Sequence, residues 1–410
     1  MRIADFSCEV NMSSAGRALS CITPPHILEK LLDSDDSDIR QAALNTLLTT
    51  ARLRGERSIR ASLAPSAAPA NGRRTIFDCQ TSTSLPMAVL VRSEDGSAST
   101  DDSINRAFDG FGSTRQFYQE VYDRNSIDDR GMRLEGYVHR GVKYNNAFWD
   151  GQEMVFGDGD EIIFTDFTNS LDVIAHELAH GVTEHTSGFE YHNQSGALNE
   201  SMSDVVGSLV KQWSLRQTAE AADWLIGSEV FTPGIDADAL RSMKAPGKAY
   251  DSELLGTDPQ PDHMSKFVHL PDTEEGDNGG VHINSGIPNK AFYLVAVGLG
   301  GYAWEAAGLI WYEALKASTV ATQFEEFADT TYFKAEELYG AGSTEQEAVL
   351  AGWREVGIRI TGVPGRSSAG KRAAATGGEP DMAALTQQIE ALSTQVKELA
   401  QDVRSLKAGN

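Results

Sequence analysis

The stretch VIAHELAHGVTEH, residues 173–185, contains the pattern His-Glu-x-x-His at His176, Glu177 and His180. Positions four apart on an α-helix share a face, so both imidazoles can reach one cation while Glu177 projects beside it. The interleaved apolar residues predict a buried helix, where a tetrahedral zinc is shielded from bulk water. A pair of structural histidines is the alternative interpretation.

A catalytic zinc site needs a third protein ligand, because it keeps three protein ligands and one water. The stretch GALNESMSDVVGSLV, residues 196–210, offers Glu200 on a second helical run. Asp204 lies one turn further on the same face and can accept a hydrogen bond from the distal nitrogen of a ligating histidine. Asn199 and Glu184 are further candidates for such support.

Composition limits the classes of partner. The 410 residues are enough for two or three domains, and the formal charge of −24 repels phosphate backbones and anionic lipids. We therefore expect no nucleic acid partner. The sequence shows neither a Sec signal peptide nor an apolar run long enough to span a membrane, which leaves cytoplasmic action and leaderless export open. Three cysteines are too few for a disulfide framework.

Periodicity divides the chain into segments. Residues 1–54 form the first segment, in which helical periodicity over 20–54 predicts a small helical unit, and 55–72 have the basic, Ala-, Pro- and Ser-rich composition of an exposed, cleavable linker. Short alternating stretches predict a strand-rich lobe over 73–190 that includes the metal-site helix, and helical periodicity predicts a second lobe over 191–362. The expected fold class is α+β.

The C-terminal stretch has a different pattern. Residues 363–381 have the composition of a flexible linker, and apolar residues in 382–408 then recur in alternating steps of four and three. The β-branched residues Ile389, Val396 and Val403 fall at one core position and leucines at the other, which favours a parallel two-stranded coiled coil and hence a homodimer. A short amphipathic helix packed on its own domain is the alternative.

Several stretches, in this order, resemble the thermolysin family of zinc endopeptidases: NNAFWDG, HELAHGVTEHTSG, ALNESMSDV, RSM and DNGGVHINSGIPNKAFYL. The resemblance covers about residues 73–360. CITPPHIL near the N-terminus resembles the short propeptide of the protealysin-like branch, which implies that residues 1–54 are a propeptide. It implies a zincin fold with an active-site cleft between a strand-rich and a helical lobe. It also implies a zinc-dependent neutral endopeptidase made as a zymogen, with the propeptide as an intramolecular inhibitor.

The resemblance also implies roles for individual residues. The zinc ligands would be His176, His180 and Glu200, and Glu177 would be the general base that passes a proton from the attacking water to the leaving amine. The groups that stabilise the oxyanion would be His282, oriented by Asp277, and Tyr191.

Substrate binding follows from the same resemblance. Asn146 and Ala147 would pair with an extended peptide, and Arg241 would hold a substrate carbonyl. The specificity pocket would be lined by Phe164, Phe167, Val173, Ile226 and Leu240. Since all five are apolar, we expect cleavage on the N-terminal side of bulky hydrophobic residues.

The sequence departs from the family at a double calcium site. Asp172 and Asp223 remain there, but the other matching positions hold Lys211, Leu225 and Ser228. A lysine ammonium can neutralise the remaining carboxylates, so we expect this site to be absent. A second, single calcium site is expected at Thr232, the carbonyl of Ile235, and Asp238.

Two alternatives concern regulation and function. Cys21 precedes the Pro-Pro unit, so its thiolate could fill zinc's open position. Otherwise the segment packs across the cleft through Ile22, Pro24, Pro25 and Leu28.

A catalytically quiet zincin-fold binding protein, or a zinc amidase acting on something other than protein, is an alternative to the peptidase. The presence of Glu177, His282 and Asn146 favours the peptidase.

Overall fold

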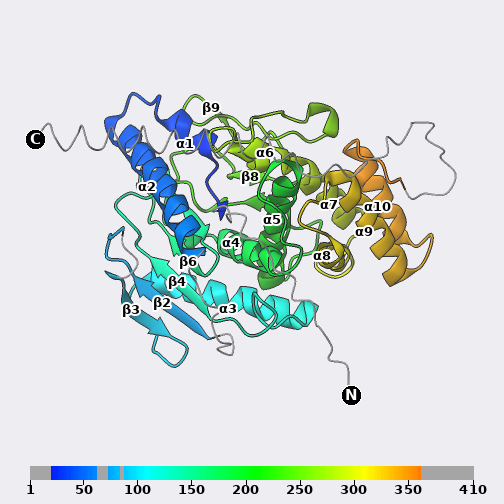
Figure 1. The fold of residues 1–410 in the computed structure, drawn as a ribbon, viewed down its shortest axis with the longest axis horizontal. Coiled ribbons are helices and arrows are strands. Elements are labelled where there is room, and N and C mark those ends of the chain that lie inside the picture. Colours follow the sequence, from blue (N-terminus) through cyan, green and yellow to red (C-terminus); the bar gives the residue numbers. More distant parts are fainter. Residues whose placement is uncertain (1–19, 62–72, 84–86, 362–410) are drawn as a thin grey trace, which may run out of the picture. The chain divides into compact units, whose positions relative to one another are not determined.

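The computed structural model describes residues 20–61, 73–83 and 87–361 (Figure 1). The chain divides into two compact units, Met1–Gly362 and Val363–Asn410. The second unit contains the predicted coiled coil and lies outside the described residues, as does most of the predicted linker 55–72.

A six-stranded sheet has the order β1-β5-β6-β4-β2-β3. Its strands are β1 (Ser20–Cys21), β2 (Arg74–Asp78), β3 (Val89–Ser93), β4 (Leu134–Val138), β5 (Ala147–Trp149) and β6 (Glu153–Phe156). The pairing β2-β4-β6 is parallel, whereas β1-β5, β5-β6 and β2-β3 are antiparallel. N-terminal residues 20–21 thus extend the sheet at the β5 edge.

Strand register places one row of apolar side chains across a single face of the sheet. Partner positions run from Cys21 through Phe148, Val155 and Tyr137 to Phe77. Helix α2 (Ser37–Ala61) covers this face, since its Leu53 is buried in the same cluster. Hydrogen bonds link α2 to the loop before β5: the Thr50 and Tyr144 hydroxyls share one, and the Asn145 N–H donates to the Thr46 hydroxyl.

The opposite face of the sheet packs against α3 (Asp102–Tyr122) and α4 (Leu171–Glu184). The rings of Phe111 in α3 and Phe156 in β6 lie 6.2 Å apart. A Cβ on Gly136 of β4 would lie 2.8 Å from the Phe111 ring, so only glycine admits α3 at this distance. The sheet therefore lies between helix α2 on one face and helices α3 and α4 on the other.

Six helices follow residue 190 in the described part of the chain (Figure 1): α5 (Asn193–Leu215), α6 (Asp277–Asn284), α7 (Gly286–Leu299), α8 (Ala306–Ala317), α9 (Phe324–Tyr339) and α10 (Thr344–Glu355). Short elements connect them or precede them: α1 (Pro25–Leu31), η2 (Phe167–Asn169), β7 (Leu225–Ile226), β8 (Arg241–Ser242), β9 (Asp251–Ser252), β10 (Gly256–Thr257) and η3 (Met264–Lys266). A Cβ on Gly207 of α5 would lie 2.6 Å from the carbonyl of Asp172, so this glycine lets α5 pack closely on α4.

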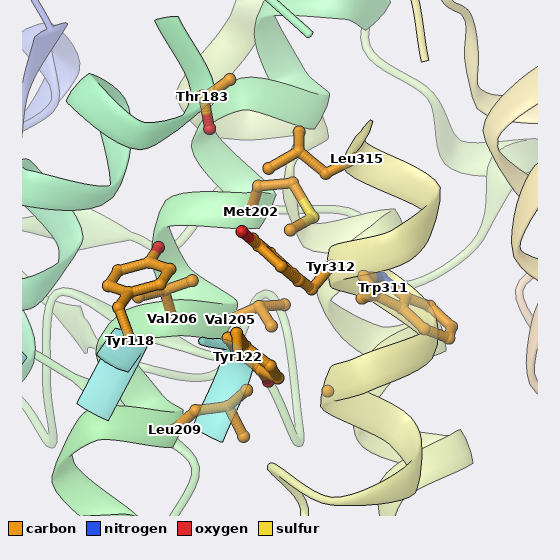
Figure 2. A pocket seen from close by; sticks show the side chains of 11 residues that line it. Tyr118, Tyr122, Thr183, Met202, Val205, Val206, Leu209, Trp311, Tyr312 and Leu315 are labelled. Atoms are coloured by element: carbon orange, nitrogen blue, oxygen red, sulfur yellow. The ribbon is translucent and has the colours of Figure 1, made fainter. Parts of the chain in front are cut away.

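A small internal cavity lies among α3, α4, α5 and α8 (Figure 2). Its lining includes Tyr118 and Tyr122 of α3, Val205 of α5, and Tyr312 of α8. Burial raises the pKa of Tyr118 and Tyr122 well above the ordinary value, so both phenols stay neutral. The cavity is a feature of the helical core, away from the histidines of α4.

The α+β prediction is confirmed, with strands before helices. Helix α2 continues to Ala61, so the first residues of the segment expected as linker are helical. In the loop after β6, the Asp160 carboxylate accepts hydrogen bonds from the backbone N–H groups of residues 162–164. No helix in the described part of the chain is long and apolar enough to cross a membrane.

Candidate active site

Helices α4 and α5 bring three candidate metal-ligand side chains together. His176 and His180 lie on one face of α4, with their Nε2 atoms 3.0 Å apart. Glu200 of α5 places its oxygens 3.6 Å from His176 Nε2 and 3.5 Å from His180 Nε2. All three side chains are buried, and each offers a ligand atom within 4.8 Å of the others. Within the described ranges, this is the group that could hold a metal ion.

The donor set fits zinc. Two imidazole nitrogens and one carboxylate are a ligand set that zinc takes in open, catalytic sites. Glu200 Oε2 is buried and has no hydrogen-bond partner among the described residues, as expected of an atom reserved for a cation. Burial lowers the pKa of His180 to about 3, which keeps a ring nitrogen free of its proton for ligation.

Neighbouring groups fix the orientation of both histidines. His176 Nδ1 lies 2.8 Å from Asp204 Oδ1. His180 Nδ1 lies 2.8 Å from Asn199 Oδ1 and 3.0 Å from Ser203 Oγ. Asp204 and Asn199 therefore lie where the sequence interpretation expected them. Ser203 was missed, although its position three residues after Glu200 places it on the same face of α5.

Glu177 lies beside this group on α4. Its Oε2 accepts a hydrogen bond from the backbone N–H of Trp149 at 2.9 Å. Burial, and then the nearby charge of Glu200, raises the pKa of Glu177 well above the ordinary value. A carboxylate in this environment can take up and hold a proton, as a general base must.

A third histidine, His282 of α6, lies beside these side chains, with its Nε2 3.6 Å from Glu200 Oε1. His282 Nδ1 lies 2.5 Å from Asp277 Oδ1, and its Nε2 lies 3.3 Å from the Tyr191 hydroxyl. Tyr191 in turn donates to Glu200 Oε1. Burial lowers the pKa of His282, but the charges of Asp277 and Glu200 outweigh it and raise the pKa to about 9. The imidazolium is thus the main form at neutral pH, and it can donate to an oxygen that gains negative charge.

Three backbone units of the N-terminal segment lie against these residues. Ile22 N–H donates to the Ala147 carbonyl at 3.1 Å, and Thr23 N–H donates to Asn146 Oδ1 at 3.0 Å. Arg241 Nη1 donates to the Ile22 carbonyl at 3.1 Å. The Cys21 carbonyl lies 2.9 Å from His282 Nε2. Residues 21–23 therefore contact the groups to which the resemblance assigns substrate binding.

The Cys21 side chain lies in the apolar cluster that α2 covers, with Leu53, Phe148 and Val155. The group of described residues that could hold a metal does not include it. The packing alternative for this segment agrees with the burial of Ile22, Pro24 and Leu28.

The five residues expected to line a specificity pocket are buried: Phe164, Phe167, Val173, Ile226 and Leu240. The rings of Phe164 and Phe167 lie 5.7 Å apart, and Leu240 N–H bonds the carbonyl of Ile226 at 3.0 Å. Ile22 of the N-terminal segment is also fully buried.

Lys211 lies among the groups that remain from the double calcium site. Its Nζ is 3.1 Å from Asp172 Oδ2, 3.0 Å from Asp223 Oδ2 and 3.5 Å from Ser228 Oγ. Burial lowers the pKa of Lys211, but Asp172 and Asp223 outweigh it, so the pKa is raised and the ammonium stays charged. At the second site, the Thr232 hydroxyl donates to the Ile162 carbonyl, and calcium binding with Ile235 and Asp238 stays a prediction.

Replacing Lys211 with methionine is expected to lower the free energy of unfolding by about 3 kcal/mol, because it leaves the buried Asp172 carboxylate without its cation. Urea unfolding measures the change. Lys266→Met is the control, since its ion pair with Asp262 is exposed and should contribute less than about 1 kcal/mol. Equal effects of the two substitutions would contradict the role assigned to Lys211.

Comparison with known proteins agrees with this geometry. The family model of the thermolysin metallopeptidase catalytic domain matches residues 70–184, and that of the alpha-helical domain matches residues 187–358. An extracellular metalloprotease of Pectobacterium carotovorum subsp. carotovorum is 45% identical over 346 residues, which cover 84% of this chain and 98% of the relative. Protease PrtS of Photorhabdus sp. (strain Az29) is 44% identical over 346 residues, which cover 83% and 92%.

The solved structure of the precursor of protealysin, a metalloproteinase from Serratia proteamaculans, superposes with a TM-score of 0.74 at 46% identity. The match covers 83% of this chain and 99% of that chain, so it is longer than the two regions that the family models match. The chain belongs to the thermolysin family of metallopeptidases, in its protealysin-like branch, and is a zinc-dependent endopeptidase made as a zymogen.

Proposed function

We propose that this enzyme cleaves peptide bonds on the N-terminal side of bulky hydrophobic residues, with His176, His180 and Glu200 as the zinc ligands. The observation that carries the proposal is the convergence of these three buried side chains beside Glu177. The alternative, a catalytically quiet binding protein, is not favoured, because Glu177, His282 and the β5 edge all face the same site.

Each residue of the site has a role in this reaction. When bound, zinc supplies a Lewis acid that lowers the pKa of a water molecule. Glu177 takes a proton from the attacking water and passes it to the leaving nitrogen. His282 and Tyr191 donate to the carbonyl oxygen as it gains charge, and Asp277 holds His282 in the orientation this requires.

We infer that residues 20–31 inhibit the enzyme by lying in the cleft like a substrate. The segment pairs with β5 as an added strand, and its carbonyls at Cys21 and Ile22 lie at His282 and Arg241. Ile22 would then fill the apolar pocket expected to set specificity. By analogy with the Pectobacterium relative, which is named as extracellular, we propose that the processed enzyme acts outside the cell.

A peptide-library digest tests the proposed function. The processed, zinc-loaded enzyme is expected to cut before Ile, Leu, Val or Phe, and activity should vanish on chelation and return with zinc. Widening the pocket with Leu240→Ala should shift the preference toward larger residues. Cleavage without any preference at that position would contradict the pocket assignment.

His26 of α1 makes the inhibitory contact sensitive to acid. Its Nε2 lies 2.8 Å from the Tyr250 hydroxyl, and burial lowers its pKa to about 4, with Asp277 opposing this and His282 and Arg241 adding to it. The neutral ring is therefore favoured in the folded zymogen. Its stabilising contribution is complete above pH 6.5 and is lost as the pH falls from 6.5 toward 4.

We expect the melting temperature of the zymogen to fall more between pH 7 and pH 4.5 in the parent chain than in His26→Gln, which keeps a hydrogen-bonding group but does not titrate. The comparison removes effects of acid on the rest of the protein. The same decrease in both proteins would exclude His26 as the sensitive group.

The predicted coiled coil gives a separate expectation. Deleting residues 382–408 should halve the mass measured by light scattering without changing the turnover of a short peptide, because the catalytic residues all lie before residue 362. An unchanged mass would favour the alternative of a helix packed on its own domain.

A further inference from the structure

One buried carboxylate, Asp204, joins the metal site to the substrate-binding arginine. Its Oδ1 lies 2.8 Å from His176 Nδ1 and 2.8 Å from Arg241 Nη2. Its Oδ2 accepts from Arg241 Nε and from Asn289 Nδ2, both at 2.8 Å. Each oxygen therefore has two partners, and together they fix the plane of the carboxylate.

We propose that Asn289 is a positioning residue that holds Asp204 in the orientation His176 needs as a metal ligand. The inference rests on the proposed zinc site. Asn289 lies on α7, outside the helices that carry the ligands, and is fully buried. Asn289 contacts the site through Asp204 Oδ2, so it acts on His176 indirectly, through Asp204.

The chemistry of the contact calls for an amide at this position. Asn289 Oδ1 is buried without a hydrogen-bond partner among the described residues, so burial of the polar amide is compensated through Nδ2. An aspartate would place a second negative charge against Asp204, and a leucine of similar size would supply no donor. The bond to Asp204 explains why a polar side chain is buried here.

The contact restrains the rotation of Asp204. Arg241 binds both oxygens, and Arg241 also holds the carbonyl of Ile22 and would hold that of a substrate. Without Asn289, the carboxylate is free to follow movements of this guanidinium and to turn away from His176 Nδ1. Removal of a group that supports a metal ligand typically lowers metal affinity by about 10–100-fold. We expect a loss near tenfold for Asn289, because Asp204 itself stays beside His176.

Zinc affinity of the full-length chain tests the proposal. The Glu177→Gln background keeps the zymogen intact, and zinc is titrated in competition with a chelator of known affinity. Asn289→Leu should weaken zinc binding by about tenfold, and Asn289→Asp by more. Asn284→Leu is the matched control, because Asn284 is equally buried but bonds to Val268 rather than to Asp204. The control should stay within about twofold.

Two further measurements separate positioning from general destabilisation. The visible spectrum of the cobalt-substituted chain should change in Asn289→Leu and not in Asn284→Leu, since it reports ligand geometry. In an Asp204→Asn background, Asn289→Leu should have less than about a twofold effect, because its route to His176 is already altered.

The outcomes are distinct. If Asn289→Leu folds and binds zinc within twofold of the parent, or weakens it equally in both backgrounds, the proposal is wrong. If Asn289→Leu does not fold, zinc affinity is measured instead for the smaller change Asn289→Ser, and the same two results would show that the proposal is wrong. A parent chain that binds no zinc would instead overturn the proposed function.

Discussion

Replacing Glu177 with glutamine is expected to lower kcat by about 10²–10⁴-fold and to leave the zinc content unchanged, because the amide cannot accept the proton of the attacking water. The side chain keeps its shape and lies on the same helix as the ligands without being one of them. Peptide hydrolysis measures the loss, and metal analysis of the purified protein measures zinc.

The same variant should fail to remove its own propeptide. A purified sample followed by gel electrophoresis is expected to stay at full length, whereas the parent chain is shortened. Glu120→Gln, in an exposed position on α3, is the control for loss of a carboxylate. Normal processing by pure Glu177→Gln protein would show that another protease performs this step.

Replacing Arg241 with methionine is expected to have the largest effect on stability. Arg241 and Asp204 form a fully buried pair with two hydrogen bonds, and removing one partner of such a pair typically costs about 3–5 kcal/mol. Urea unfolding of the zymogen in the Glu177→Gln background measures it. The loss also removes the bond to the Ile22 carbonyl, so the propeptide should dissociate more readily after cleavage.

Two comparisons make this prediction specific. Adding Asp204→Asn to Arg241→Met should restore part of the stability, since the uncompensated charge is then absent. Arg133→Met, which breaks an exposed pair with Glu135, should cost less than about 1 kcal/mol. A loss below about 1 kcal/mol in Arg241→Met would contradict the assignment of a strong buried pair.

The sequence predicted side-chain positions most accurately where the residues concerned are spaced with the period of a single helix. The spacing of His176 and His180 predicts both the helix and the shared face, and the structure places them with their ring nitrogens 3.0 Å apart. Helical spacing also places Glu200 and Asp204 on one face of α5. The end of the N-terminal helix was less well predicted: the composition after residue 54 indicates a linker, but α2 continues to Ala61.

Other parts of the site depend on contacts between distant segments, for which one sequence holds no local signal. Asn289 donates to Asp204 across 85 positions, and Trp149 N–H donates to Glu177 across 28. The Ile22 carbonyl meets Arg241 across 219 positions. Such pairs arise when whole helices and strands pack, and no periodicity within either segment predicts them.

Spacing and residue chemistry within single elements are local properties, so the sequence predicts the α+β fold class and the candidate metal ligands and base. The packing of distant segments places three side chains, those of His176, Arg241 and Asn289, around the Asp204 carboxylate, and it lays residues 20–23 along β5. The physical reason is that a buried charge must find its partners wherever packing brings them, and those partners come from helices and strands far apart in the chain.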